Sequence, residues 1–373
     1  MELLQRINAF VQLGDFLSQF SRTEITKKEG VPFNDLFFDG LQHQIKLAGQ
    51  HNGWFTKENI LYAIEGWTES LTEAQLTQWL TPYESAFAKA SLRGSQPEEE
   101  RSVKVETAST PKTIAVIMAG NIPLVGFHDF LSVLISGHRV IVKQSSNDKH
   151  LLPFLAKYLE YVAPAYKGMI TFTEEKLEAY DAVIATGSDN TARYFDYYFG
   201  KKPNIIRKNR NSVAVLTGQE TPEQLEALAE DIFRYYGLGC RNVSKLYVPE
   251  DYNFDAFFNA IYAWKDIINQ AKYANNYDYN KAVYLMSLFE MLENGFLMLK
   301  EDASFGSPIA TLFYEKYTSL ASLYTTLEEH SDNIQCVVGE GLDINTIAFG
   351  HTQKPQLHDY ADGVDTIAFL LKK

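Results

Sequence analysis

The segment YGLGCRN (236–242) carries the residue type best suited to nucleophilic chemistry. An apolar helix pattern ends there, two glycines allow a sharp turn, and Cys240 follows shortly before a strand pattern. A cysteine on such a turn can be presented to a cleft, and the neighbouring Arg241 favours its thiolate. A small buried cysteine is the structural alternative, and the local pattern leaves both open. Cys336, in the apolar run IQCVVG, is expected in a core strand.

Three further motifs follow short apolar strand patterns. Asn121 lies in an Asn-Ile-Pro turn, where its amide could stabilise a negative oxygen on a tetrahedral carbon or cap the next helix. Lys143 ends the next strand pattern, where it could bind a nucleotide ribose or phosphate, or face solvent. A Thr-Gly-Ser turn places Gly187 and Ser188 before a helix pattern, an arrangement that favours anions.

Alternating strand and helix patterns position these motifs. The alternation predicts a parallel sheet with helices on both faces, and such sheets bind ligands at the carboxyl ends of their strands. The fold class is therefore α/β. The expected strands are 113–119, 139–143 and 182–186, and the expected helices are 124–137, 150–163 and 190–199.

The patterns divide the chain into three parts. Residues 1–95 form a helical segment, residues 96–215 together with 346–373 form a dinucleotide-binding domain, and residues 216–345 form a catalytic domain with Cys240. Helix starts are expected at the capping boxes that begin with Thr72 and Thr221. Further strands are expected at 102–106, 212–216, 244–249 and 365–371.

Composition excludes several classes of protein. A net charge of −13 over 373 residues disfavours a general nucleic-acid binder, because phosphate binding requires a basic surface. No apolar run has the roughly 18–20 residues of a membrane span, and the start lacks a signal-peptide pattern, so a cytoplasmic location is expected. Two cysteines do not make a disulfide framework, and no metal-ligand spacing is present, so no metal site is expected.

Taken in order, the four motifs resemble the aldehyde dehydrogenase superfamily, and the chain is most similar to its LuxC-like acyl-CoA reductases. The segments that carry the closer resemblance are RKNRNSVAVL, GLGCRNVSKLYVP and the tail FGHTQKPQLHDYADGVDTIAFL (349–370). The resemblance implies a Rossmann-type cofactor domain with a parallel sheet and a second α/β catalytic domain, preceded by a helical N-terminal segment. It also implies a homodimer, with 102–106 and 365–371 similar to oligomerisation elements.

The resemblance assigns roles to individual residues. Cys240 would be the nucleophile, and Asn121 would stabilise the oxyanion together with the Cys240 backbone N–H. The remaining roles concern the cofactor: Lys143 would contact the adenosine ribose or its phosphate, Gly187 and Ser188 the pyrophosphate, and Glu329 the nicotinamide ribose.

Two departures from the superfamily pattern bear on the reaction. Hydrolytic members carry a water-activating Glu where this chain has IRKNRNS (206–212), which has no carboxylate. Many NAD-preferring members carry Glu three residues after the lysine, where this chain has Ser146, so a 2′-phosphate is not repelled. The expected reaction is therefore NADPH-dependent reduction of an acyl thioester, with fatty acyl-CoA as the leading substrate, to the aldehyde through acyl-Cys240. NADH stays open.

Other interpretations stay open. The donor could be a short acyl-CoA, an acyl phosphate or an acyl-protein thioester, with an acyltransferase or acyl-protein synthetase as partner. A nucleotide-binding scaffold without activity is the alternative from another class. The basic run KKPNIIRKNR (201–210) could attract the phosphates of CoA or NADPH, although a solvated loop is the preferred interpretation.

Overall fold

The fold is that of a computed structural model, which describes residues 1–88, 111–187 and 189–372. The chain divides into a first unit, residues 1–208 with 356–373, and a second unit, residues 209–355. The helical N-terminal residues, which the sequence set apart, belong to the first unit, and the second unit begins at 209 where the sequence suggested 216. The expected strand at 102–106 lies outside the described residues.

The first unit is built on a five-stranded parallel sheet with the order β3-β2-β1-β4-β5. In the register, Ile117 at the end of β1 pairs with Lys143 on β2 and with Ala185 on β4. The chain runs outward from β1 in one direction and then in the other, so the carboxyl ends of β1 and β4 form the crevice that binds ligands in such sheets. The strands are β1 (Thr113–Ile117), β2 (Arg139–Lys143), β3 (Ile170–Phe172), β4 (Ala182–Thr186) and β5 (Asn204–Arg207).

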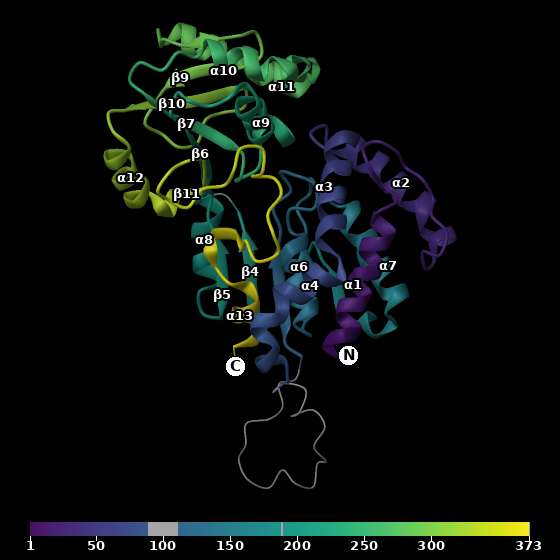
Figure 1. Ribbon diagram of the computed structural model, residues 1–373. Coiled ribbons are helices and arrows are strands. Elements are labelled where there is room, and N and C mark those ends of the chain that lie inside the picture. The colour runs from purple at the N-terminus through teal and green to yellow at the C-terminus, as the bar shows by residue number, and fades with distance from the viewer. Residues whose placement is uncertain (89–110, 188, 373) are drawn as a thin grey trace, which may run out of the picture. The chain divides into compact units, whose positions relative to one another are not determined.

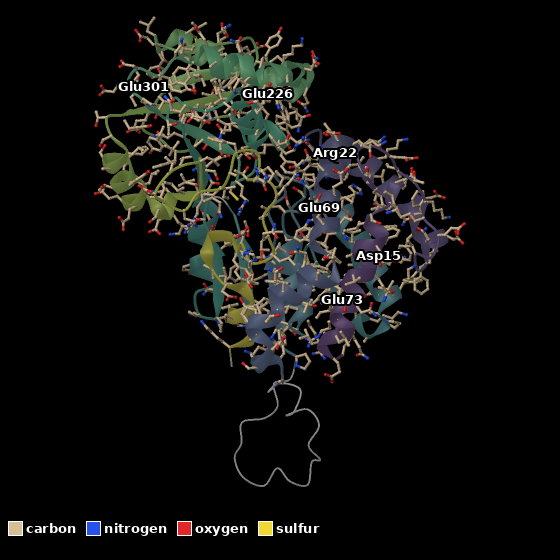
Figure 2. All side chains as sticks on the ribbon, viewed as in Figure 1. Asp15, Arg22, Glu69, Glu73, Glu226 and Glu301 are labelled. Atoms are coloured by element: carbon tan, nitrogen blue, oxygen red, sulfur yellow. The ribbon has the colours of Figure 1, made fainter. Side chains whose placement is uncertain are left out.

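Helices cover this sheet, and Figure 1 shows α1 beside α7. Phe16 of α1 stacks on Tyr158 of α7 with their ring centroids 4.3 Å apart, so the N-terminal helices share the core of the sheet. Asp15 and Glu73, two residues of these N-terminal helices that are labelled in Figure 2, are exposed carboxylates. The helices are α1 (Leu3–Leu17), α2 (Asn34–His51), α3 (Lys57–Ser70), α4 (Glu73–Leu80), α6 (Phe127–Ile135), α7 (Leu151–Val162) and α8 (Asp189–Phe199).

The expected strand at 365–371 was wrong, because this segment is the helix α13 (Thr366–Leu371). The Asp365 side chain accepts the Ala368 N–H and caps the helix. Ile367 and Leu370 then point into the core of the first unit at helical spacing. A short apolar run has no clear period, which is why the sequence suggested a strand. The homodimer stays a prediction without support from this segment.

The second unit is built on a six-stranded sheet with the order β11-β6-β7-β10-β9-β8, parallel except for the short strand β8. The strands expected at 212–216 and 244–249 are confirmed as β6 (Asn211–Val215) and β7 (Val243–Pro249). The capping box at Thr221 is confirmed at the start of α9 (Pro222–Phe233). The other elements are α10 (Asp255–Ala260), α11 (Ala271–Met286), β8 (Leu292–Glu293), β9 (Met298–Glu301), β10 (Thr311–Tyr317), α12 (Leu320–Glu329) and β11 (Ile334–Val338).

Candidate active site

The Cys240 turn, residues 234–242, joins α9 to β7 in the second unit. After α9 ends, three successive residues adopt positive φ: Tyr235 at 55°, Tyr236 at 60° and Gly237 at 73°. Positive φ is unfavourable for a tyrosine, so the surrounding contacts must hold this reversal in place. The reversal leaves Cys240 exposed, three positions before β7 begins at Val243.

Asn242 holds the Cys240 turn together. Its side chain is 2% exposed. The amide Nδ2 donates to the carbonyl oxygens of Asp231 at 2.9 Å and Arg234 at 2.8 Å, and Oδ1 accepts the Gly239 N–H at 2.8 Å. One buried side chain thereby satisfies the end of α9 and the backbone beside Cys240. The sequence analysis included Asn242 in the motif but gave it no role.

A second network ties the neighbour of Cys240 to the C-terminal segment FGHT (349–352). Both carboxylate oxygens of the buried Asp231 accept hydrogen bonds: from the Gly350 N–H at 2.7 Å, and from the Thr352 N–H at 2.9 Å and hydroxyl at 2.8 Å. Arg241 Nε donates to the Thr352 carbonyl at 2.8 Å. Burial raises the pKa of Asp231, and the hydrogen bonds from Gly350 and Thr352 oppose that rise. The segment 349–352 thus fixes the guanidinium group of Arg241 next to Cys240.

Cys336 is also part of this region. The strand prediction is confirmed by β11, but the side chain is half-buried rather than in the core, because β11 is an edge strand. The Ser212 hydroxyl lies 2.9 Å from the Cys336 sulfur and donates to the Cys240 carbonyl, also at 2.9 Å. Burial raises the pKa of the Cys336 thiol, and the positive charge of Arg241 opposes that rise.

The Asn121 turn, residues 118–126, follows β1 in the first unit, and Asn121 itself is exposed. Gly120 packs so closely on the next loop that a Cβ there would lie 2.6 Å from the Ser145 side chain. Leu124 has a φ of 57°, and its N–H donates to the Asp148 carboxylate at 3.2 Å. Asp148 is 8% exposed, and burial raises its pKa to about 6. A buried carboxyl therefore holds this turn.

The loop after β2 carries Lys143 and Ser146 at the same edge of the sheet. The Met118 N–H donates to the Lys143 carbonyl at 3.0 Å, which joins this loop to the start of the Asn121 turn. Lys143 Nζ donates to the Glu175 carbonyl at 3.1 Å. Ser146 is exposed, and its carbonyl lies 2.6 Å from His51 Nε2 at the end of α2. The backbone of the loop is thus anchored while the Ser146 side chain faces outward.

Three further residues, Gly187, Ser188 and Glu329, were predicted to bind the cofactor. Gly187 directly follows β4 and is half-buried, at the same carboxyl edge as Asn121 and Lys143. Ser188 lies outside the described residues. Glu329 is exposed and ends α12 in the second unit. The first unit therefore gathers Asn121, Lys143 and Gly187 at one edge of its sheet, and the second unit carries Cys240 and Glu329.

The basic run 201–210 is not the solvated loop that the sequence favoured, because β5 passes through it. Arg207 forms a buried ion pair with Asp129 and donates to the Thr366 hydroxyl at 3.2 Å. Lys202 donates to the Tyr180 carbonyl. The charged groups of Arg207 and Lys202 therefore make contacts within the first unit, whereas Lys201 and Lys208 are exposed.

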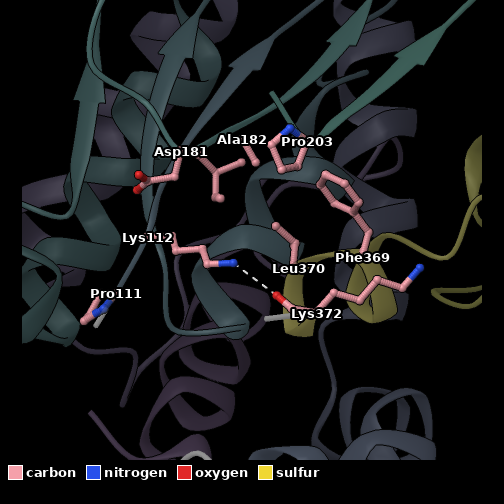
Figure 3. Close-up of a pocket in the computed structure, with 9 residues that line it drawn as sticks. Pro111, Lys112, Asp181, Ala182, Pro203, Phe369, Leu370 and Lys372 are labelled. Carbon is pink, nitrogen blue, oxygen red and sulfur yellow. Dashed lines mark hydrogen bonds between the residues drawn. The ribbon is translucent and has the colours of Figure 1, made fainter. Parts of the chain in front are cut away.

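A cavity of about 520 Å³ in the first unit lies away from these motifs (Figure 3). It opens at the amino ends of β1, β4 and β5, where Lys112 Nζ donates to the Lys372 carbonyl at 3.1 Å. Ligands of parallel sheets bind at the opposite, carboxyl edge. The cavity is therefore lined by none of the residues that the sequence predicted for catalysis or cofactor binding.

Comparison with known proteins identifies relatives by sequence and by fold. Residues 84–263 match the family described as acyl-CoA reductase (LuxC). A long-chain acyl-protein thioester reductase from Aliivibrio fischeri is 26% identical over 217 residues, which cover 52% of this chain and 43% of that protein. Aldehyde dehydrogenase 21 from Physcomitrella patens superposes with a TM-score of 0.61 at 11% identity, covering 100% of this chain and 84% of that structure. Residues 84–263 of this chain are therefore LuxC-like, and the chain has the aldehyde dehydrogenase fold.

A further solved structure agrees on the fold of the LuxC-like chain. The indole-3-acetaldehyde dehydrogenase from P. syringae superposes with a TM-score of 0.58 at 13% identity, covering 91% of this chain and 72% of that structure. At such identities the likeness concerns the fold alone. The chain spans less than half of the A. fischeri relative in the match.

The LuxC-like chain also shows what the sequence could not reveal. Asp148, Asp231 and Asn242 each hold a turn or a segment of the candidate site, but their partners come from other elements. Asn242 and residues 350–352 lie inside the segments that carry the family resemblance, and this was the one sequence signal that pointed to them. Among the described residues, no cluster of His, Cys, Asp and Glu could bind a metal, and no helix is both long and apolar enough to cross a bilayer.

Proposed function

We propose that this chain reduces an acyl thioester to the aldehyde through a covalent acyl-Cys240 intermediate, with fatty acyl-CoA as the leading substrate. The observation that carries the proposal is the exposed Cys240 on a turn held by Asn242, in a LuxC-like chain. A fixed and accessible thiol beside a cation is suited to nucleophilic catalysis.

The first half-reaction uses the chain's own residues. The Cys240 thiolate attacks the carbonyl carbon of the thioester, and the carbonyl electron pair moves onto oxygen. The Asn121 amide and the Cys240 N–H are the proposed donors to this oxyanion. When the carbonyl reforms, the carbon–sulfur bond to CoA breaks, the CoA thiolate leaves, and the acyl group stays on Cys240.

The fate of the acyl group follows from what the site lacks. The segment 206–212 ends β5 and begins β6, and it has no carboxylate to activate water. Hydrolysis of acyl-Cys240 to the acid is therefore disfavoured. Hydride addition to the acyl carbon would instead give a thiohemiacetal on Cys240, which collapses to the free aldehyde and the thiol.

The carboxyl edge of the first sheet fits a dinucleotide. The strand order β3-β2-β1-β4-β5 puts the carboxyl ends of β1 and β4 at the point where the sheet changes direction, and Gly120 lets the turn after β1 pack closely on the Ser145 side chain of the next loop. Lys143, Gly187 and Ser188 would hold the adenosine ribose and the phosphates, and Glu329 the nicotinamide ribose. Because Ser146 is exposed and uncharged, a 2′-phosphate is accepted there, so we propose NADPH over NADH. The nicotinamide would supply the hydride when bound.

The test is cofactor oxidation by the purified chain with a long-chain acyl-CoA, with NADPH and NADH in parallel, and detection of the aldehyde. Omitting the cofactor should trap the acyl group on Cys240, where peptide mass spectrometry locates it. Cys240→Ala should abolish both signals, and Cys336→Ala is the matched control for losing a cysteine. Normal turnover by Cys240→Ala would refute the scheme.

An acyl-protein donor is the second candidate, because the A. fischeri relative is an acyl-protein thioester reductase by name. The same assay with an acylated carrier protein, and with acyl phosphate and short acyl-CoA, separates the donors. A rate that rises only with the acylated protein would shift the proposal to a partner-dependent enzyme. Failure of every donor, with no acyl-Cys240 formed, would favour a non-catalytic nucleotide-binding protein.

A further inference from the structure

The chain has two cysteines, 96 positions apart, and one hydroxyl contacts the backbone carbonyl of the first and the sulfur of the second. Ser212 Oγ is 2.9 Å from the Cys240 carbonyl oxygen and 2.9 Å from the Cys336 sulfur. We propose that Cys336 is a resolving thiol for Cys240, and that an intramolecular Cys240–Cys336 disulfide forms when a peroxide oxidises Cys240. This modification is independent of the proposed reductase activity.

The hydrogen bonds define the resting state of the pair. Because the Ser212 hydroxyl donates its proton to the Cys240 carbonyl, its oxygen is left to accept the Cys336 S–H. Cys336 is therefore a protonated, half-buried thiol. Cys240 is exposed and next to Arg241, so it is the thiol that a peroxide in solution reaches first. The two cysteines thus have different roles, one as the target and the other as the resolving group.

Burial is the largest influence on the Cys336 thiol and raises its pKa, and the charged groups around the thiol modify that effect. Arg241, Asp231 and Cys240 are the groups whose charges act on the Cys336 thiol. The Cys240 thiolate opposes ionisation of Cys336, and oxidation of Cys240 to the uncharged sulfenic acid removes that opposition. Arg241, which is held by Thr352, stays in place and favours the thiolate.

The backbone at both cysteines is irregular, so it can supply the movement that a disulfide needs. A disulfide requires Cα atoms about 4.4–6.8 Å apart. Cys336 lies where the register between β11 and β6 shifts, on an edge strand. A second register shift follows Ser212 between β6 and β7, and Cys240 comes directly after Gly239. Regular central strands would resist such a shift, whereas a bulged edge and a glycine-rich turn adapt more readily.

The chemistry balances with hydrogen peroxide as the oxidant. The Cys240 thiolate attacks one peroxide oxygen, the O–O bond breaks, hydroxide leaves, and Cys240 becomes a sulfenic acid. The Cys336 sulfur then attacks the Cys240 sulfur, the S–O bond breaks, and the departing hydroxide takes the Cys336 proton as water. A dithiol reductant such as dithiothreitol reverses the modification.

The experiment is brief treatment of the full chain with hydrogen peroxide, alkylation of the remaining thiols under denaturing conditions, and intact-mass and peptide analysis. We expect accessible thiols to fall from two per chain to none, with the loss of two hydrogen atoms and a Cys240–Cys336 peptide pair. Dithiothreitol should restore both thiols. The readout is covalent, so it does not depend on whether the chain is a reductase.

Cys336→Ser is the informative variant, because its hydroxyl can still donate to Ser212. Without a resolving thiol, Cys240 should instead gain oxygen atoms and pass to the sulfinic acid, which dithiothreitol does not reverse. Cys336→Ala should behave in the same way, which guards against a folding effect of either substitution. The proposal is overturned if peroxide oxidises wild-type Cys240 while Cys336 stays alkylatable, if the disulfide joins two chains, or if neither thiol reacts.

Discussion

The Asn121 turn and the Cys240 turn each follow a buried element, and each contains non-glycine residues with positive φ. Leu124 has a φ of 57° in the first, and Tyr235 has a φ of 55° in the second. In both, a buried polar side chain accepts a backbone N–H within the turn: Asp148 in one and Asn242 in the other. The Asp148 side chain can carry a negative charge, whereas the Asn242 side chain is always neutral.

That difference determines how each turn responds to its surroundings. Asn242 is neutral and uses both ends of its amide. Asp148 has one carboxylate oxygen that is buried without a hydrogen bond in the described structure, and burial raises its pKa to about 6. The Asn242 contacts in the Cys240 turn therefore do not titrate, whereas the Asn121 turn is held by a group that ionises near neutral pH. The two turns that carry Cys240 and Asn121 are thus secured by different chemistry.

Asn242→Ala should have the largest effect on stability. It leaves the carbonyls of Asp231 and Arg234 and the Gly239 N–H without this partner, at about 1–3 kcal/mol for each buried group. We expect the free energy of unfolding to fall by about 4 kcal/mol, measured by urea denaturation. Asn276→Ala on the exposed face of α11 is the control, expected within about 0.5 kcal/mol. Equal effects of the two variants would show that Asn242 does not hold the turn.

Asn121→Ala should leave the fold intact and slow acylation of Cys240 by about 10²–10³, the usual cost of losing one oxyanion donor. Single-turnover formation of acyl-Cys240 measures this step directly. Asn147→Ala, also exposed and in the neighbouring loop, is the matched control and should acylate at the wild-type rate. An unchanged acylation rate in Asn121→Ala would make Asn121 a structural residue of its turn.

Asp148→Asn tests the charge itself. The folded carboxyl binds its proton more tightly than the unfolded one, with a pKa of about 6 against 3.8, so ionisation destabilises the fold. The penalty is absent below about pH 4 and complete above about pH 6, where it reaches at most about 3 kcal/mol. Asn keeps an acceptor for the Leu124 N–H without the charge.

Urea denaturation at several pH values measures this effect. Above pH 6, Asp148→Asn should be more stable than wild type, and the gain should vanish towards pH 4. The exposed Asp15→Asn should change the unfolding free energy by less than about 0.5 kcal/mol throughout. A gain that does not vary with pH would mean that the charge of Asp148 is not the cause.

Lys208→Glu should have the smallest effect. Arg207 is committed to Asp129, so the exposed Lys208 is left to attract phosphates from this part of the run. We expect a change in KM for the acyl-CoA of at most about twofold, smaller at high salt. A large, salt-sensitive rise in KM would restore the phosphate-binding interpretation of residues 201–210.

The sequence predicted the central strands and the α9 cap well, because each signal is local. Short β-branched runs specify β1, β2 and β4, and the Thr221 capping box lies within one turn of its helix. The apolar run at 365–371 was misread because its period is ambiguous without the Asp365 cap.

The residues that hold the candidate site could not be predicted from local sequence patterns. Asp231 and Thr352 are 121 positions apart, and the two cysteines 96. The pairing of β11 with β6 and of β6 with β7 brings the cysteine-bearing segments together, and the chain after β11 returns to α9 at Asp231. Cys240 and Asn121 could be proposed from the sequence because each lies in a contiguous motif, whereas the residues that hold their turns are distant in the sequence.

The second unit is inserted between two parts of the first, which has a consequence for synthesis on the ribosome. Residues 209–355 are complete before α13 has been translated. The first unit needs α13, because the Thr366 hydroxyl accepts from Arg207 and the Leu370 carbonyl lies 2.9 Å from His138 Nε2. The core of the first unit therefore cannot be completed until residues 366–371 have been synthesised, after the whole of the second unit.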